Sequence, residues 1–182
     1  MDYITDWAGL RDFIWVIPLM FSIHEVEEWN ILKWYRKYYK NLPESTNTSI
    51  RIHIVVLSLV SVLLTLLAVM VPGNALFAVI TVFMSVFILL NFLQHVICTI
   101  QLRAYSPGLF TGIMCIMVIT GMNVIFALNG FIALPYYLMT LFIVPSLVGT
   151  LKVKGEMTKG VRNVHNFFIR VEKALAGILP KH

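Results

Sequence analysis

The sequence predicts an all-α membrane protein, a polytopic bundle of five transmembrane helices followed by an amphipathic helix at the membrane surface. Of its 182 residues, 59% are hydrophobic and only 13% are charged, whereas about a quarter of residues are charged in soluble domains. The mean hydropathy is +0.83. The apolar residues gather in five segments, each close to the roughly 20 residues that a helix needs to cross a bilayer. We therefore expect a single membrane domain over residues 1–182.

The five apolar segments follow one another with recognisable breaks. We expect the spans at residues 13–32, 52–71, 75–102, 109–128 and 131–151. Pro18 predicts a kink in the first span, because proline removes a helical hydrogen bond. Pro72-Gly73 separates the second and third spans, and Asn129-Gly130 separates the last two; both pairs are typical of turns.

The basic residues indicate how the bundle is oriented. Of the 14 lysines and arginines, all but Arg11 fall in the first loop, the third loop or the carboxyl-terminal tail. These segments share one side of a five-span bundle, and the positive-inside rule places that side in the cytoplasm. We expect a multi-pass protein of the cell membrane, with its amino terminus outside and its carboxyl terminus in the cytoplasm. Basic residues that flank spans in this way do not form a nucleic-acid surface.

Residues 156–179 predict an amphipathic helix after the last span. Its apolar residues recur at alternating spacings of three and four, namely Val161, Val164, Phe168, Val171, Leu175 and Ile178. Arg162, Arg170 and Lys173 lie at other positions of the segment. Such a helix is expected to lie on the cytoplasmic leaflet, and binding to a partner protein is the alternative.

The polar residues of the first span are the main functional signal. His24, Glu25, Glu27 and Glu28 end an otherwise apolar run. Ionisable groups inside a bilayer cost about 2.5–3.5 kcal/mol each on insertion scales, so they usually face a bundle interior and indicate function. At about 100° per residue, His24, Glu27 and Glu28 share one helical face, and Glu25 points away from it.

A second polar pair lies in the third span. Asn91 and His95 are four residues apart and therefore share a helical face. His24 and His95 each precede the basic end of their helix by about 12–13 Å of helical rise, so both are expected at one depth in the inner leaflet. The turn Tyr105-Ser106-Pro107-Gly108 returns the chain to the bundle at the same layer.

These motifs resemble those of the HxxEE family of bacterial integral membrane proteins. Residues 24–28, His-Glu-Val-Glu-Glu, match its signature, His95 matches its further histidine, and Tyr105 to Gly108 match its YxPG motif. The resemblance covers the first four expected spans in the right order. It implies an integral membrane protein of about this length and brings no established activity with it.

Two imidazoles and a carboxylate make a candidate metal site. The expected ligands are His24, His95 and one of the two glutamates, which we take to be Glu28. Two histidines and a carboxylate form the donor set of zinc hydrolases or, with open positions, of non-haem iron oxygenases. The spare carboxylate is a candidate general base that activates a metal-bound water. A hydrogen-bonded network that only holds helices together is the structural alternative.

Two further residues complete the predicted site. Asn91 is expected to orient a metal ligand from outside the coordination sphere. Tyr105 is expected to donate a proton or a hydrogen bond to the substrate. Together with Glu27 and Glu28, Tyr105 forms the predicted catalytic set.

The sequence favours a membrane-embedded metalloenzyme acting on a lipid or amphiphile at the cytoplasmic leaflet. Hydrolysis through a metal-bound water is the expected reaction, and oxidation or hydroxylation of a lipid at a non-haem iron is its alternative. A transporter coupled to protons or ions would instead use Glu27 and Glu28 as proton-binding groups. A structural or regulatory membrane subunit is the remaining alternative.

Overall fold

The computed structural model describes residues 7–140 and 155–178, and within these ranges the regular elements are all helices, with no strand. The elements are α1 (Trp7–Asp12), the 3-10 helix η1 (Phe13–Trp15), α2 (Val16–Glu27), α3 (Leu32–Tyr38), α4 (Asn47–Met70), α5 (Asn74–Leu102), α6 (Leu109–Leu128), α7 (Leu134–Leu138) and α9 (Lys159–Ile178). The predicted all-α class is confirmed.

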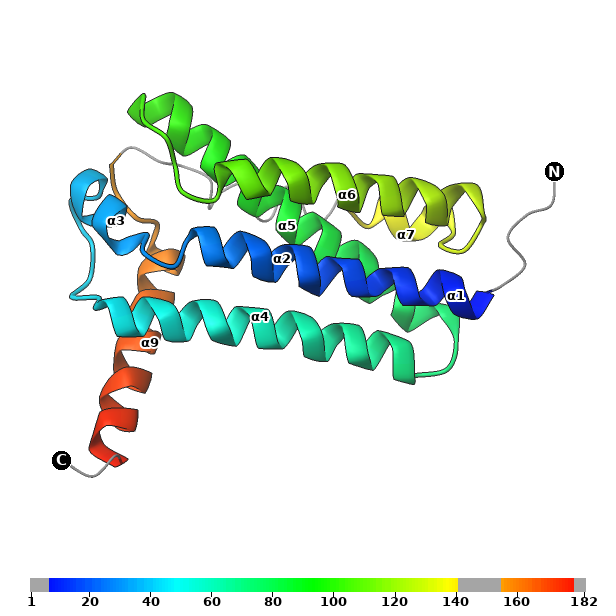
Figure 1. The fold of residues 1–182 in the computed structure, drawn as a ribbon, viewed down its shortest axis with the longest axis horizontal. Coiled ribbons are helices and arrows are strands. Elements are labelled where there is room, and N and C mark those ends of the chain that lie inside the picture. The colour runs from blue at the N-terminus through cyan, green and yellow to red at the C-terminus, as the bar shows by residue number, and fades with distance from the viewer. Residues whose placement is uncertain (1–6, 141–154, 179–182) are drawn as a thin grey trace.

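Four long rods form the bundle. The first is made of α1, η1 and α2 in line, and it lies between α4 and α6, with α5 behind it (Figure 1). The buried core draws on all four rods, for example through Ile17, Ala68, Phe77 and Ile119. At one end of the bundle lie α3 and α9, and α9 runs across the long axes of the other helices (Figure 1).

Among the described residues, three helices are long and apolar enough to cross a membrane, namely α4, α5 and α6. The bounds of α5 and α6 match the third and fourth expected spans closely. The second expected span corresponds to α4, which begins at Asn47 rather than at residue 52. Thr46 and Ser49 form a reciprocal capping box that starts the helix there.

The first expected span differs from the sequence prediction. The helical rod of the first span begins earlier, at Trp7, and it ends at Glu27 rather than at residue 32. Residues 28–31 form a turn instead, in which Ile31 N donates to Glu28 O at 2.8 Å. Residues 141–151 of the fifth expected span lie outside the described residues.

Arg11 is the one basic residue that the sequence places on the other side of the bundle from the rest, and it has structural partners. Its guanidinium donates hydrogen bonds to Ala68 O at 2.8 Å and Val71 O at 3.1 Å, and it lies 5.2 Å from the ring centre of Phe77. The last carbonyls of a helix lack intrahelical donors. Arg11 therefore caps the carboxyl terminus of α4 and ties it to the start of the first rod.

The predicted amphipathic helix is present as α9, and it docks against the start of α4. His165 and Phe168 are buried at the contact. Ser45 Oγ lies 2.9 Å from His165 Nδ1, and Thr46 Oγ1 donates to the carboxylate of Glu172 at 2.7 Å and 2.8 Å. Other apolar residues of α9 remain exposed, namely Val161, Val164, Phe167 and Leu175.

Candidate metal centre

The last turn of α2 places His24 and Glu28 side by side. His24 lies in the helix, and Glu28 is the residue that ends it, four positions later. His24 Nε2 lies 3.2 Å from Glu28 Oε1, and both residues are buried. The turn that follows Glu27 thus leaves Glu28 close enough to the helix to face the imidazole.

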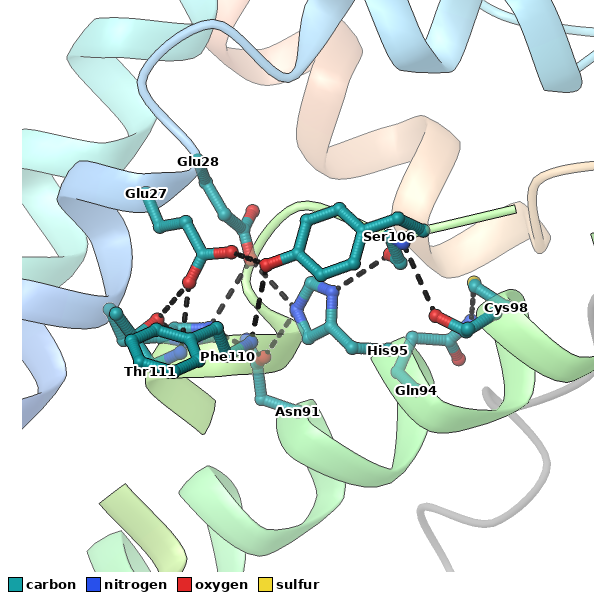
Figure 2. Close-up of polar contacts among 12 residues, drawn as sticks. Glu27, Glu28, Asn91, Gln94, His95, Cys98, Ser106, Phe110 and Thr111 are labelled. Atoms are coloured by element: carbon teal, nitrogen blue, oxygen red, sulfur yellow. Dashed lines mark hydrogen bonds and ion pairs between the residues drawn. The ribbon is translucent and has the colours of Figure 1, made fainter. Parts of the chain in front are cut away.

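Two residues of α5 complete the cluster from the opposite side. His95 Nε2 lies 2.8 Å from Glu28 Oε1. Asn91 Oδ1 lies 3.0 Å from His24 Nε2 and 2.9 Å from His95 Nε2. Four atoms from α2 and α5, two nitrogens and two oxygens, therefore converge on one point; Figure 2 shows Glu28, Asn91 and His95 meeting there.

The hydrogen bonds around His24 determine where its proton lies. Thr111 Oγ1 donates to Glu27 Oε2 at 2.6 Å, so the same hydroxyl accepts a hydrogen bond from His24 Nδ1 at 3.1 Å. A neutral His24 therefore carries its proton on Nδ1, and its Nε2 lone pair faces Glu28 Oε1 and Asn91 Oδ1. Three acceptor atoms facing one another repel, and a cation between them, a metal ion or a second proton on His24, relieves the repulsion.

The spacing of the four atoms fits a metal ion. Metal–ligand bonds of about 2.0–2.1 Å place neighbouring ligand atoms about 2.9–3.4 Å apart, and the contacts here range from 2.8 to 3.2 Å. Ligand atoms of His24, Glu28 and His95 all lie within 4.8 Å of one another. Apart from the two histidine nitrogens, buried Glu28 Oε1 has no hydrogen-bond partner among the described residues. His24, Glu28 and His95 thus lie within metal-binding distance of one another.

The loop from Tyr105 to Gly108 covers the centre. Ser106 is buried, and its Oγ lies 3.0 Å from His95 Nδ1, which orients that ring as Thr111 orients the ring of His24. Gly108 has a φ of +95°, and a Cβ there would lie 2.7–2.8 Å from atoms of His95, Glu28 and His24. Only glycine allows this backbone to lie so close to the cluster.

The model of one protein family matches residues 15–123, and its description is "Protein of unknown function with HXXEE motif". The chain belongs to the HXXEE family. The match contains every residue of the cluster and of its covering loop. No curated protein and no solved structure matches the chain.

The two adjacent glutamates of the HXXEE motif have different partners. Glu28 faces the histidines, whereas Glu27 Oε2 accepts hydrogen bonds from the backbone N–H of Thr111 at 2.9 Å and from its hydroxyl. Glu27 Oε1 accepts a short hydrogen bond from the phenol of Tyr105 (Figure 2). The N–H groups of a first helical turn lack intrahelical acceptors, so Glu27 caps α6 and lies outside the four converging atoms.

Tyr105 lies at the exposed edge of the HXXEE site. Its side chain is 55% exposed. Its backbone oxygen accepts a hydrogen bond from Trp34 Nε1 at 2.9 Å, which fastens the loop to α3. Partial burial and the hydrogen bond to Glu27 raise the pKa of the Tyr105 phenol. Tyr105 therefore keeps its proton near neutral pH and is a group that can donate it.

The sequence analysis placed His24, Asn91, His95 and Glu28 in the site, and the structure brings all four together. Glu25 contacts none of the converging atoms, although it is buried. Ser106 and Thr111 were not singled out. Thr111 is the third residue of α6, a position whose free N–H attracts carboxylates, but this position alone does not indicate which carboxylate binds there.

Proposed function

We propose that this HXXEE protein is a membrane-embedded metalloprotein with His24, Glu28 and His95 as its metal ligands. The observation that carries the proposal is the convergence of two imidazole Nε2 atoms, Glu28 Oε1 and Asn91 Oδ1 on one point, with the His24 proton held on the opposite side of its ring. Asn91 Oδ1 is placed to serve as a fourth ligand or to hold the two imidazoles apart.

We further propose that the centre performs hydrolysis at the cytoplasmic leaflet. A bound divalent ion would act as a Lewis acid and lower the pKa of a water molecule. Glu27 and Tyr105, hydrogen-bonded to each other beside the cluster, form a carboxylate–phenol pair. In this proposal Tyr105 gives its proton to the leaving group as the bond to that group breaks, and the proton that the attacking water loses returns to the Tyr105 oxygen. The Glu27 carboxylate holds the phenol in position.

The location of the centre favours a lipid or amphiphile as substrate. His24 and His95 lie near the end of the bundle where α3 and α9 are found (Figure 1). Basic residues concentrate at this end, so the positive-inside rule places it in the cytoplasm and the amino terminus outside. A five-span multi-pass topology, with residues 131–151 as the fifth span, belongs to this proposal.

Oxidation at iron is the second candidate reaction. Two histidines and one carboxylate form the facial triad of non-haem iron enzymes. Adjacent ligand atoms in an octahedron with bonds near 2.0–2.1 Å lie about 2.9 Å apart. The distances from Glu28 Oε1 to the two Nε2 atoms, 2.8 Å and 3.2 Å, lie on either side of this value.

The metal content of the purified protein tests the proposal. We expect near-stoichiometric zinc or iron by plasma mass spectrometry after purification in mild detergent without chelators. The metal should be lost in His24→Ala, His95→Ala and Glu28→Gln, and kept in the control His53→Ala, whose imidazole lies outside the cluster. Absence of metal from the wild-type protein, or equal metal in all variants, would exclude the centre.

A further inference from the structure

A groove between α2, α4 and α5 lies next to the candidate centre. It encloses about 190 Å³, and its walls include Phe21, Leu57, Val60, Leu64, Phe83 and Phe87. Ser61 is its one polar lining residue, and the Ser61 hydroxyl already donates to Ser58 O at 2.8 Å. The groove therefore offers an apolar surface without a free polar group.

Phe21 connects the groove to the metal centre. It lies one helical turn before His24, and the two rings are stacked with their centres 6.3 Å apart. The same phenylalanine contacts Phe87 edge to face, with ring centres 5.9 Å apart. Since α2 runs from the far end of the bundle toward α3, the groove lies on the side of His24 away from the proposed cytoplasmic surface.

The groove opens sideways from the bundle. Phe21, Met84 and Ile88 are buried and form its floor, whereas Val60 and Phe83 at its rim are exposed. Two of its walls belong to α4 and α5, which are long and apolar enough to span a membrane. In a membrane, the open side of the groove would therefore face the lipid chains.

We propose that this groove binds one acyl chain of the substrate, with the substrate's polar end at the metal centre. One part of this inference, that the bound acyl chain belongs to a substrate, rests on the proposed function. A dry cavity of about 150 Å³ holds a benzene molecule, so the groove has room for several methylene groups. The substrate class is then a lipid or other amphiphile whose reactive bond lies near its headgroup.

A lipid chain fits the groove better than a second copy of this protein. Helices that pair in membranes usually approach through small residues, which allow close backbone contact. The exposed residues of α4 along the groove and beside it are instead branched and bulky, such as Leu59, Val60 and Leu63. Flexible acyl chains adapt to such a surface.

Photocrosslinking with a fatty acid that carries a mid-chain diazirine tests the inference. In the full-length protein in lipid nanodiscs, we expect labelling to concentrate on groove residues such as Leu64 and Phe87. Leu64→Trp fills the groove and should reduce this labelling at least fivefold. Leu63→Trp, a neighbouring substitution at a residue that does not line the groove and is 61% exposed, is the matched control and should leave it unchanged. If Leu64→Trp does not fold, Val60→Trp at the exposed rim replaces it.

Labelling that is spread evenly over α4 and α5, or that Leu64→Trp does not reduce, would overturn the acyl site. Crosslinks between two copies of the chain instead of to the fatty acid would overturn it as well. Metal content measured on the same samples separates this inference from the metal centre. Bound metal without groove labelling refutes the acyl site alone. Groove labelling without metal refutes the metal centre and shows a lipid site without the proposed chemistry. His24→Ala should lose metal and keep the labelling.

Discussion

Glu28 Oε1 lies 2.8 Å from His95 Nε2, and this contact joins the end of α2 to the carboxyl-terminal half of α5. Both residues are buried among apolar helices. A charged carboxylate in such surroundings is stable only with close partners, and here its partners are two imidazoles. The contact is therefore the structural link between the HXXEE motif and His95.

Removal of the metal should lower the stability of the folded protein. A ligand present at about 100 times its dissociation constant stabilises the native state by about 2.7 kcal/mol. We expect a chelator to lower the Tm of the wild-type protein and added zinc or iron to restore it. His24→Ala should show neither change, and thermal unfolding in detergent measures both.

Gly108→Ala should disrupt the centre. The added Cβ would lie 2.7–2.8 Å from atoms of His95, Glu28 and His24, at a backbone φ of +95°. We expect a loss of about 1–3 kcal/mol in the free energy of unfolding from the backbone strain alone, together with loss of metal. Gly121→Ala is the matched control, because no atom lies within 4 Å of its added Cβ and the residue is inside α6. Metal retained at the wild-type level in Gly108→Ala would contradict the geometry.

Thr111→Val should weaken metal binding without removing any ligand. The hydroxyl of Thr111 bridges Glu27 Oε2 and His24 Nδ1, and groups that orient a liganding histidine typically contribute 10–100-fold in metal affinity. We expect a rise of this size in the dissociation constant, measured by competition with a chelating dye. Thr111→Ser keeps the hydroxyl and should restore most of the affinity; equal affinities in both variants would refute the bridge.

The docking of α9 should weaken in acid. Burial and the neighbouring His53 lower the pKa of His165 to about 4, and its ring also packs against Tyr35 and Ser45. Because this pKa lies below the unfolded value of about 6.5, the unfolded state binds more protons between pH 6.5 and pH 4. Stability should therefore fall as the pH decreases through this window, by up to about 3 kcal/mol at 1.36 kcal/mol per pKa unit.

Limited proteolysis of α9 as a function of pH measures this effect. We expect cleavage within α9 to increase between pH 6.5 and pH 4 in the wild-type protein. His165→Gln cannot titrate in this range, so its cleavage should change less with pH. A wild-type profile that stays flat down to pH 4 would show that protonation of His165 does not release the helix.

The sequence by itself determined the all-α class, the bounds of α5 and α6 and, apart from the choice between Glu27 and Glu28, the members of the cluster. Apolar runs of spanning length define helices without reference to the rest of the chain. Helical periodicity put both glutamates on the face of His24 and Asn91 on the face of His95, and helical rise placed the two histidines at one depth. The structure brings His24, Glu28, Asn91 and His95 together.

Only the tertiary structure decided which glutamate faces the histidines. A helical wheel places Glu27 and Glu28 on nearly the same face, and it assumes that the helix continues beyond both. The helix ends at Glu27, and the free N–H groups of α6 bind Glu27, which leaves Glu28 to His24 and His95. Helix ends are satisfied by partners distant in sequence, so no local pattern could assign the two carboxylates, and the same holds for Ser106 and Thr111.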